Sequence, residues 1–407
     1  MCESFYGKVY IVGDGFCYEG IIISKNNSKY HFIIDCGSQA PKNNAQRVGE
    51  LSSKKDCDIR LQEVSKEIIN HEKHINLFVL THLHVDHYNG MKTLFNSGIP
   101  DVIIMPYLYP EERLFLIINS DIDREESDFL TMPYTTILRL AKEKNPDAKL
   151  ILIRGNSDSN DEIALDNRDT DESNIWGKPH EDFENIMELE DIKSSDIEVV
   201  HASQKSIKIL NAVWIFKFFN LEADKNDVDV LKKIVGKLTS KNLYNNISNL
   251  KKQYEKIAKN FFNDFNNTSI VTYHAPFQNH YKLGTLITGD INLNHDIADL
   301  ILKYYKKEID KIGLFSIPHH GSDKNWNKAF IDNGMLDDSV CFASTHNYYP
   351  KRMTSIMMSD LRCHNISMLV VDENRFSEFI HIIKVYEKFY QYHIIRKNNH
   401  KLIEIYT

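Results

Sequence analysis

The segment THLHVDHYNG, residues 81–90, constrains this chain most, because it places His82, His84, Asp86 and His87 directly after the apolar run INLFVL. The run predicts a buried strand, so the four side chains gather where the strand ends. Alternate residues of an extended chain share a face, so His82 and His84 can bind one ion. A turn into a following helix would direct Asp86 and His87 to a second ion. Zinc and manganese accept such ligands at open sites, so a metal centre is favoured over surface or helix-capping histidines.

The sequence around this segment alternates between strand and helix signals. Apolar runs separated by turn signals predict two or three strands within residues 5–37, and further strands over 75–80 and 100–106. A helical spacing of apolar residues predicts a helix over 61–71, and a short helix closed by Gly98 follows the histidine cluster. This alternation is typical of an α/β layer architecture.

The C-terminal half continues the pattern. The runs TSIVTYHA and LGTLITGD, which end at Ala275 and Asp290, predict a hairpin. A helix is expected over about 294–307. The run IGLFSIPHHGSD then begins as an apolar strand and ends in the adjacent pair His319 and His320, and further strands and helices are expected beyond residue 339.

We expect one domain over residues 1–407 with two insertions. Residues 155–195 are rich in acidic side chains, Asn and Ser, and predict an acidic surface insertion. Residues 225–265 predict a helical insertion, in which an apolar stripe over 243–265 alternates with lysines. Such a stripe is typical of a helix packed on the core. A helix beside a polyanionic substrate, or a contact with a second copy or a protein partner, is the alternative.

Composition limits the classes of function. Hydrophobic residues make up 42% and charged residues 26%, as in globular proteins. The net charge of -8 argues against a surface built wholly to hold nucleic acid, but is compatible with a local basic groove. The N-terminus has no basic segment before an apolar one, and no run approaches a membrane span, so we expect a cytoplasmic protein without membrane contact. The six cysteines are isolated, which predicts reduced thiols.

Within the opening segment, HLHVDH resembles the HxHxDH signature of the metallo-β-lactamase superfamily. That resemblance implies an α/β (α+β) protein, a four-layer αββα sandwich with one or two metal ions at the edge of its sheets. FIIDCGS resembles the superfamily's first motif and implies that Asp35 supports the metal loop from behind. LITGD implies that Asp290 bridges two ions, and IPHHGSD resembles the last histidine motif. The implied ligands are His82, His84, Asp86, His87, Asp290 and one histidine of that motif.

Further motifs resemble one branch, the metallohydrolase domain of the DNA-uptake protein ComEC and related soluble hydrolases. They are VGDG at 12–15, with a shifted residue order, NNTSIV at 266–271, PHHGS at 318–322 and ASTHNYYP at 343–350. One departure concerns the first ion, for which many members supply a third histidine before the bridging Asp. The histidines of the intervening segment lack such a context, so we expect them on the surface or in the core, and water or substrate to complete the site; they are His180, His201, His274 and His280.

Adjacent residues at a strand end point to opposite sides, so we expect only one of His319 and His320 to bind metal. We assign the ion to His320 and a substrate-facing catalytic role to His319, for which a hydrogen-bonded supporting role is the alternative. Antiparallel pairing should bring the residues before the TSIVTYHA strand back to the metals. The remaining candidates beside the site are Asn266 and Asn267, which are otherwise turn residues, Ser322, and His346, which could instead cap a turn.

Two divalent ions about 3.5–4 Å apart would lower the pKa of a shared water to about 7. We expect zinc, with manganese as the alternative. Asp86 would orient the nucleophile while binding metal, and His319 would stabilise the oxyanion or protonate the leaving group. The resemblance implies phosphodiester hydrolysis, by a nuclease or a nucleotide phosphodiesterase, with nucleic acid or a nucleotide as the substrate. A lactone, ester or thioester hydrolase is the alternative, and a metal-binding partner protein without turnover is a third hypothesis.

Overall fold

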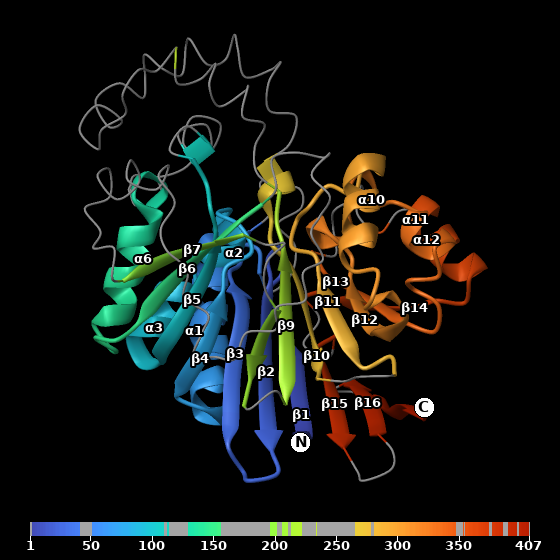
Figure 1. The fold of residues 1–407 in the computed structure, drawn as a ribbon, viewed down its shortest axis with the longest axis horizontal. Helices are drawn as coiled ribbons and strands as arrows, with labels where there is room; N and C mark the ends of the chain where they lie inside the picture. Colours follow the sequence, from blue (N-terminus) through green and yellow to red (C-terminus); the bar gives the residue numbers. More distant parts are fainter. Residues whose placement is uncertain are drawn as a thin grey trace.

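The computed structural model describes residues 2–40, 51–109, 112–113, 129–155, 196–201, 206–210, 213–221, 233, 265–277, 281–346, 353, 355–373, 377–385, 390–396 and 399–406. These residues form a mixed α/β structure with two mixed β-sheets and several helices (Figure 1). The predicted acidic insertion at 155–195 and the predicted helical insertion at 225–265, with its stripe at 243–265, lie outside the described residues except at their margins and Lys233.

The larger sheet has the strand order β17-β16-β15-β1-β2-β3-β4-β5-β6-β7. From β3 to β7 all neighbours are parallel, so the carboxyl ends of these strands share one edge. β1, β2 and β3 pair antiparallel. The strands are β1 (Cys2–Val9), β2 (Cys17–Ser24), β3 (Lys29–Cys36), β4 (His74–Val79), β5 (Ile99–Pro106), β6 (Lys149–Arg154), β7 (Ile197–His201), β15 (Phe379–Val385), β16 (Tyr390–Arg396) and β17 (Asn399–Tyr406).

The smaller sheet has the order β14-β13-β12-β11-β10-β9-β8. β10 pairs antiparallel with β11, as the predicted hairpin requires, and β11 to β14 are parallel. The carboxyl ends of β11 and β12 therefore lie at one edge as well. The strands are β8 (Ser206–Ile209), β9 (Trp214–Phe219), β10 (Val271–Pro276), β11 (Gly284–Ile287), β12 (Ile312–Ser316), β13 (Val340–Ser344) and β14 (Ser367–Val371).

Helices cover the outer faces of both sheets (Figure 1). α1 (Lys54–His71), α3 (Met91–Ser97) and α6 (Pro133–Lys142) share one hydrophobic cluster with the larger sheet. α10 (His295–Tyr304), α11 (Ala329–Asp332) and α12 (Ser355–Cys363) share another with the smaller sheet. A third cluster lies between the sheets and includes Phe32 and Trp214. None of the described helices is long and apolar enough to cross a membrane.

Two predicted elements have different bounds in the structure. The helix expected over 61–71 begins at Lys54, because Ser53 and Asp56 form a capping box that starts it seven residues earlier. Its first turn is polar and carries no apolar period, so the sequence pattern missed it. Of the strands expected within residues 5–37, the one that begins in the run KVYIVG at residues 8–13 ends at Val9, and Gly13, with a φ of 69°, lies in the loop that follows.

The cysteines carry no disulfide within the described part of the chain. Cys17, Cys36, Cys57 and Cys341 are buried thiols, and Cys363 is exposed. Burial raises the pKa of the Cys341 thiol above its ordinary value, which keeps it protonated. These side chains therefore contribute to the core as small apolar groups.

Candidate metal centre

The loops that follow β4, β11 and β12 meet at one edge of the two sheets. The β4 loop carries residues 81–87, including the short helix α2 (Val85–Tyr88), the β11 loop carries Asp290, and the β12 loop carries His319 and His320. A backbone hydrogen bond from His319 N to Gly289 O at 3.2 Å joins the β12 and β11 loops, and one from Ile270 N to Thr81 O at 2.9 Å joins the β4 loop to the segment before β10. The site therefore lies where the larger and the smaller sheet are linked.

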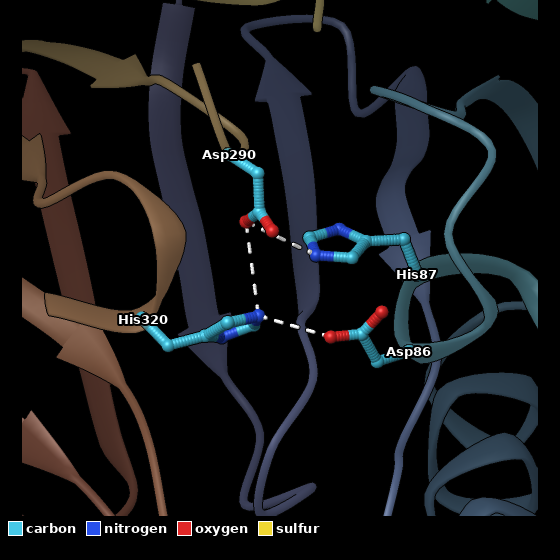
Figure 2. A group of neighbouring side chains, drawn as sticks. All are labelled: Asp86, His87, Asp290 and His320. Atoms are coloured by element: carbon cyan, nitrogen blue, oxygen red, sulfur yellow. Dashed lines mark hydrogen bonds and ion pairs between the residues drawn. The ribbon is translucent and has the colours of Figure 1, made fainter. Parts of the chain in front are cut away.

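Four side chains gather in an inner cluster of Asp86, His87, Asp290 and His320 (Figure 2). Their ligand atoms all lie within 4.8 Å of one another. His87 Nε2 is 3.3 Å from Asp290 Oδ1, and His320 Nε2 is 3.7 Å from that same oxygen. His320 Nε2 is also 3.2 Å from Asp86 Oδ2. Two imidazole nitrogens and two carboxylates thus converge on one point.

An outer cluster shares one residue with the inner one. It consists of His82, His84 and Asp290, whose ligand atoms are again within 4.8 Å of one another. His82 Nε2 is 3.6 Å from Asp290 Oδ2, whereas Oδ1 faces the inner cluster. His82 and Asp290 are buried and His84 is half-buried. Asp290 therefore presents one oxygen to each cluster, which is the arrangement of a carboxylate that bridges two ions.

Hydrogen bonds fix which nitrogen of each ring faces the clusters. Asp35 Oδ2 lies 2.7 Å from His87 Nδ1, and the Ser344 carbonyl lies 3.0 Å from His320 Nδ1. Thr81 Oγ1 donates to Asp35 at 2.6 Å, so its oxygen accepts from His82 Nδ1 at 3.1 Å. Since each Nδ1 faces an acceptor, Nε2 is the nitrogen of each ring that faces Asp290 and would bind an ion.

The clusters fit a metal ion by two tests. First, His82 Nε2 and His87 Nε2 are buried and form no hydrogen bond within the described part of the chain. Second, two atoms that each bind one ion at about 2.1 Å are about 3.4 Å apart in tetrahedral geometry, close to the 3.3–3.7 Å between these nitrogens and Asp290. A cavity of about 10 Å³, lined in part by His87, Asp290 and His320, leaves room for one ion or water.

The protonation states also suit a cation. Burial lowers the pKa of His84 to about 3, and burial lowers that of His82 as well, so both rings are neutral. Burial alone would raise the pKa of Asp86 and of Asp290, but the neighbouring histidines hold both well below the ordinary range. His87 and His320 differ: burial lowers the pKa of each ring, but the nearby carboxylates, Asp290 foremost, raise it more, so a bound ion would replace the proton on each Nε2. The carboxylates are therefore ionised, as metal binding requires.

Two glycines lie against the β4 loop, residues 81–87, which we call the metal loop. A Cβ on Gly37 would lie 2.3 Å from the Asp86 carbonyl carbon, and one on Gly15 would lie 2.8 Å from the Asp86 oxygen. Phe16 N donates to that oxygen at 3.2 Å. These contacts explain the glycines of VGDG and DCGS, because only a residue without a side chain allows such a close approach.

Asp35 also has an unusual backbone. Its φ is 55°, although it is not glycine, and its Oδ1 accepts from Thr81 N at 2.7 Å. A non-glycine residue in this left-handed region is strained, and the surrounding contacts must hold it there. The strained aspartate lies behind His87, as the resemblance implied, and contacts the metal loop at three donors.

The expectation that His319 and His320 point to opposite sides is wrong. β12 ends at Ser316, so neither residue belongs to a strand. Both lie in the 3-10 turn η7 (His319–Gly321), in which φ is 48° for His319 and 55° for His320. The turn brings both rings to Asp290: His320 joins the inner cluster, and His319 Nε2 lies 3.9 Å from Asp290 Oδ2.

The other predicted residues differ in how close they come to the clusters. Asn266, in the turn η5 (Phe265–Thr268), has its Nδ2 3.2 Å from His319 Nδ1. Ser322 donates its backbone N–H to the His319 carbonyl at 3.0 Å. The side-chain oxygen of Asn267 is buried and forms no hydrogen bond with the described residues. His346 is buried, and its Nε2 lies 2.6 Å from Glu373 Oε1, outside both clusters of described residues.

None of the histidines between the HxHxDH segment and Asp290 joins the clusters of described side chains. His274 lies between the two sheets, where its ring packs 5.0 Å from that of Phe32, so it is a core residue as expected. His180, His280 and the side chain of His201 lie outside the described part.

Two residues of the site had no place in the sequence interpretation. Thr81 orients both Asp35 and His82, and its position directly before HLHVDH is a signal that could have found it. Asn325 is buried, and its Oδ1 lies 3.1 Å from His319 Nδ1. No spacing in the sequence indicated that contact, since it depends on the turn that follows His320.

The chain matches no protein-family model and no curated protein sequence.

Proposed function

We propose that the protein is a metal-dependent hydrolase of the metallo-β-lactamase superfamily, ComEC-like branch, that cleaves phosphodiester bonds as a nuclease or a nucleotide phosphodiesterase. The observation that carries the proposal is Asp290, which divides its two carboxylate oxygens between two histidine clusters. The layering of helices, two sheets and helices, with the clusters at the sheet edge, supports the αββα sandwich of that superfamily.

The residues of the two clusters would hold two divalent ions, which we expect to be zinc, with manganese as the alternative. Asp86, His87, His320 and Asp290 would hold one, and His82, His84 and Asp290 the other. When bound, such a pair supplies an acidic water and neutralises negative charge that develops on substrate oxygens. Asp290 sets the spacing between the two positions.

The charge of the site favours an anionic substrate. Two divalent ions carry four positive charges, and the carboxylates of Asp86 and Asp290 offset two of them. Asp35, which is buried behind His87, offsets a third. A net positive charge remains, and it attracts a phosphodiester more strongly than a neutral lactone or ester. A lactone and a thioester therefore serve as the comparison substrates in the assay, and they test the alternative function.

The exposed side of the site is formed by His319. A third of its side chain is accessible to solvent (33%), whereas those of His82, His320 and Asp290 are almost wholly buried. Substrate therefore approaches past this ring, with Asn266 beside it. His87 and His320 of the inner cluster are almost wholly buried, which limits the contact of that cluster with water.

The experiment is metal analysis of the purified protein joined to a cleavage assay. Labelled single- and double-stranded DNA, RNA, cyclic nucleotides, a lactone and a thioester are each incubated with zinc- or manganese-loaded protein. Asp86→Ala and Asp290→Asn should abolish turnover, whereas His74→Ala, a half-exposed histidine paired with Asp101, should retain it. Turnover of the lactone or thioester alone would support the alternative, and bound metal without any turnover would support a partner protein.

A further inference from the structure

We infer that His319 is the third imidazole ligand of the outer cluster, and that Asn325 is the positioning residue that sets its tautomer. This inference rests on the proposed function, because it requires an ion beside His82, His84 and Asp290. It replaces the water or substrate expected to complete this site with a side chain from beyond Asp290 in the chain.

The distances allow the assignment. His319 Nε2 lies 3.9 Å from Asp290 Oδ2, the oxygen that His82 Nε2 approaches to 3.6 Å. Two atoms that each bind one ion at about 2.1 Å are about 3.4 Å apart in tetrahedral geometry, so His319 Nε2 would have to move about 0.5 Å closer to Oδ2. His319 lies outside the mutual 4.8 Å distances that unite His82, His84 and Asp290. Its ring must therefore move toward them when an ion binds, and a side chain that is one third exposed is less tightly packed than the buried histidines.

The hydrogen bonds of Asn325 determine which nitrogen of His319 carries the proton. Asn325 Nδ2 donates to the Asp290 backbone carbonyl at 3.3 Å, and a carbonyl only accepts, so the orientation of the amide is set. Asn325 Oδ1 then faces His319 Nδ1 at 3.1 Å and accepts its proton. Asn266 Nδ2, 3.2 Å from the same nitrogen, cannot donate to it while that proton is present.

With its proton on Nδ1, the neutral tautomer of His319 has its lone pair on Nε2, the nitrogen that faces Asp290 in His82, His87 and His320 as well. This lone pair faces the ionised oxygen of Asp290, and two acceptors at 3.9 Å repel each other unless a cation lies between them. In this tautomer the neutral ring has no proton to give at Nε2. The arrangement thus favours a metal ligand over the proton donor expected for His319.

The backbone supports the same role. Both His319 and His320 adopt the left-handed region, with φ of 48° and 55°, which non-glycine residues avoid unless other contacts hold them there. The turn places the two rings on either side of Asp290, 6.1 Å apart between centroids. His320 approaches Oδ1 at 3.7 Å and His319 approaches Oδ2 at 3.9 Å. Adjacent histidines in a strand could not both reach one carboxylate.

The test is metal binding by the full-length protein, independent of activity. Protein stripped with a chelator is titrated with zinc by calorimetry, and with cobalt by visible absorption, which responds to the number of imidazole ligands. The variants are His319→Ala, Asn325→Leu and Asn325→Asp, in which Asp keeps an oxygen acceptor for Nδ1. His74→Ala is the control, and circular dichroism checks the fold of each variant.

We expect two ions for the wild type, with His319→Ala weakening one of them by about 100-fold or more while the other is retained. Asn325→Leu should weaken the same ion by about 10-fold to 100-fold, and Asn325→Asp should restore it. Two ions bound by His319→Ala with unchanged affinity and cobalt spectrum would overturn the inference and leave the proposed function intact. A wild type that binds only one ion also overturns the inference, and one that binds none overturns the proposed function as well.

Discussion

Asp35 illustrates at the residue scale how one buried carboxylate organises the site. It accepts from Thr81 N, Thr81 Oγ1 and His87 Nδ1, and these three bonds use both of its oxygens. Its φ of 55° is better tolerated by Asn than by most other residues, so Asp35→Asn keeps the backbone while removing one acceptor oxygen. The variant therefore tests the effect of the lost hydrogen bond without a change in the backbone conformation.

We predict that Asp35→Asn weakens metal binding by about 10-fold to 100-fold, because His87 loses the acceptor that holds its Nε2 toward Asp290. Competition with a coloured chelator measures the change. Asp101→Asn, at an exposed pair with His74, is the matched control. Equal affinity for Asp35→Asn and wild type would show that the tautomer of His87 does not depend on this carboxylate.

A second buried carboxylate, Glu19, lies on β2 beneath α1. It accepts from Tyr10 OH at 2.6 Å, His71 Nδ1 at 2.9 Å and His31 Nε2 at 3.0 Å. His31 Nδ1 also faces the His74 carbonyl at 2.9 Å, so both of its ring nitrogens face acceptors. Burial would raise the pKa of Glu19, but the bonds from His31 and His71 lower it.

This network predicts a pH dependence of stability. The hydrogen bond to Glu19 raises the pKa of His71, with Glu67 adding to the effect and Lys8 opposing it. A histidine whose pKa is raised by folding stabilises the folded state fully at pH values below its pKa in the unfolded chain, about 6.5. This stabilisation is lost as the pH rises through its pKa in the folded protein. His71→Gln keeps a donor but not the charge, so it should cost up to about 1 kcal/mol at pH 6. In urea unfolding, the difference in unfolding free energy between wild type and His71→Gln should become smaller above about pH 7. A difference that stays constant with pH would contradict this prediction.

At the scale of elements, the loops after β1 and β3 fix the position of the metal loop, residues 81–87, more than the short helix α2 within it does. α2 has only four residues, Val85–Tyr88, and no side-chain cap at His84. The peptide between Asp86 and His87 instead lies against Gly15 and Gly37, from the loops after β1 and β3. The position of Asp86 and His87 is therefore determined by neighbouring elements.

We predict that Gly37→Ala displaces this loop, since its Cβ would lie 2.3 Å from the Asp86 carbonyl carbon. The cost is about 1–3 kcal/mol of unfolding free energy, with weaker metal binding. In Gly98→Ala the two nearest atoms are the ends of the Ile69 and Ile75 side chains, which can move, so this control should bind metal normally. Thermal unfolding and zinc titration of both variants give the comparison.

The capping box at the start of α1 involves residues outside both clusters. Ser53 accepts from Asp56 N, and Asp56 accepts from Ser53 N at 3.0 Å. Ser53→Ala should lower the unfolding free energy by about 1 kcal/mol and leave the number of bound ions unchanged. Denaturant unfolding and metal analysis measure the two effects separately. A loss of bound metal in this variant would indicate that α1 is coupled to the site.

At the scale of the whole molecule, the clusters join the two sheets. His82, His84, Asp86 and His87 follow β4 of the larger sheet, whereas Asp290 and His320 follow strands of the smaller one. A bound ion would therefore link both sheets, and the folded state alone has the site. At a free zinc concentration 100 times the Kd, binding stabilises the protein by about 2.7 kcal/mol.

Zinc should thus raise the midpoint of thermal unfolding, and a chelator should reverse the change. Asp290→Asn should show a much smaller shift, because it weakens both clusters at once. Differential scanning calorimetry with and without zinc measures both. A shift of the same size in the variant would mean that zinc stabilises the chain elsewhere.

The residue types of the two clusters and their order along the chain could be predicted from the sequence, because HLHVDH, LITGD and PHHGS each follow an apolar strand. Such strands are buried in a sheet, so their ends lie at a sheet edge. The same reasoning failed at Lys54, where a capping box and not an apolar period starts the helix. It failed again at His319, which lies in a turn beyond the end of β12.

Local residue patterns thus specify which donor side chains the site contains and which strands they follow, since strand periodicity and metal chemistry depend only on local residue types. How the donors combine depends on tertiary contacts. The left-handed turn at His319 and His320, the amide of Asn325 and the division of Asp290 between two clusters depend on contacts between residues that are far apart in the chain. Such contacts form only when two sheets pack, and no local pattern encodes their geometry.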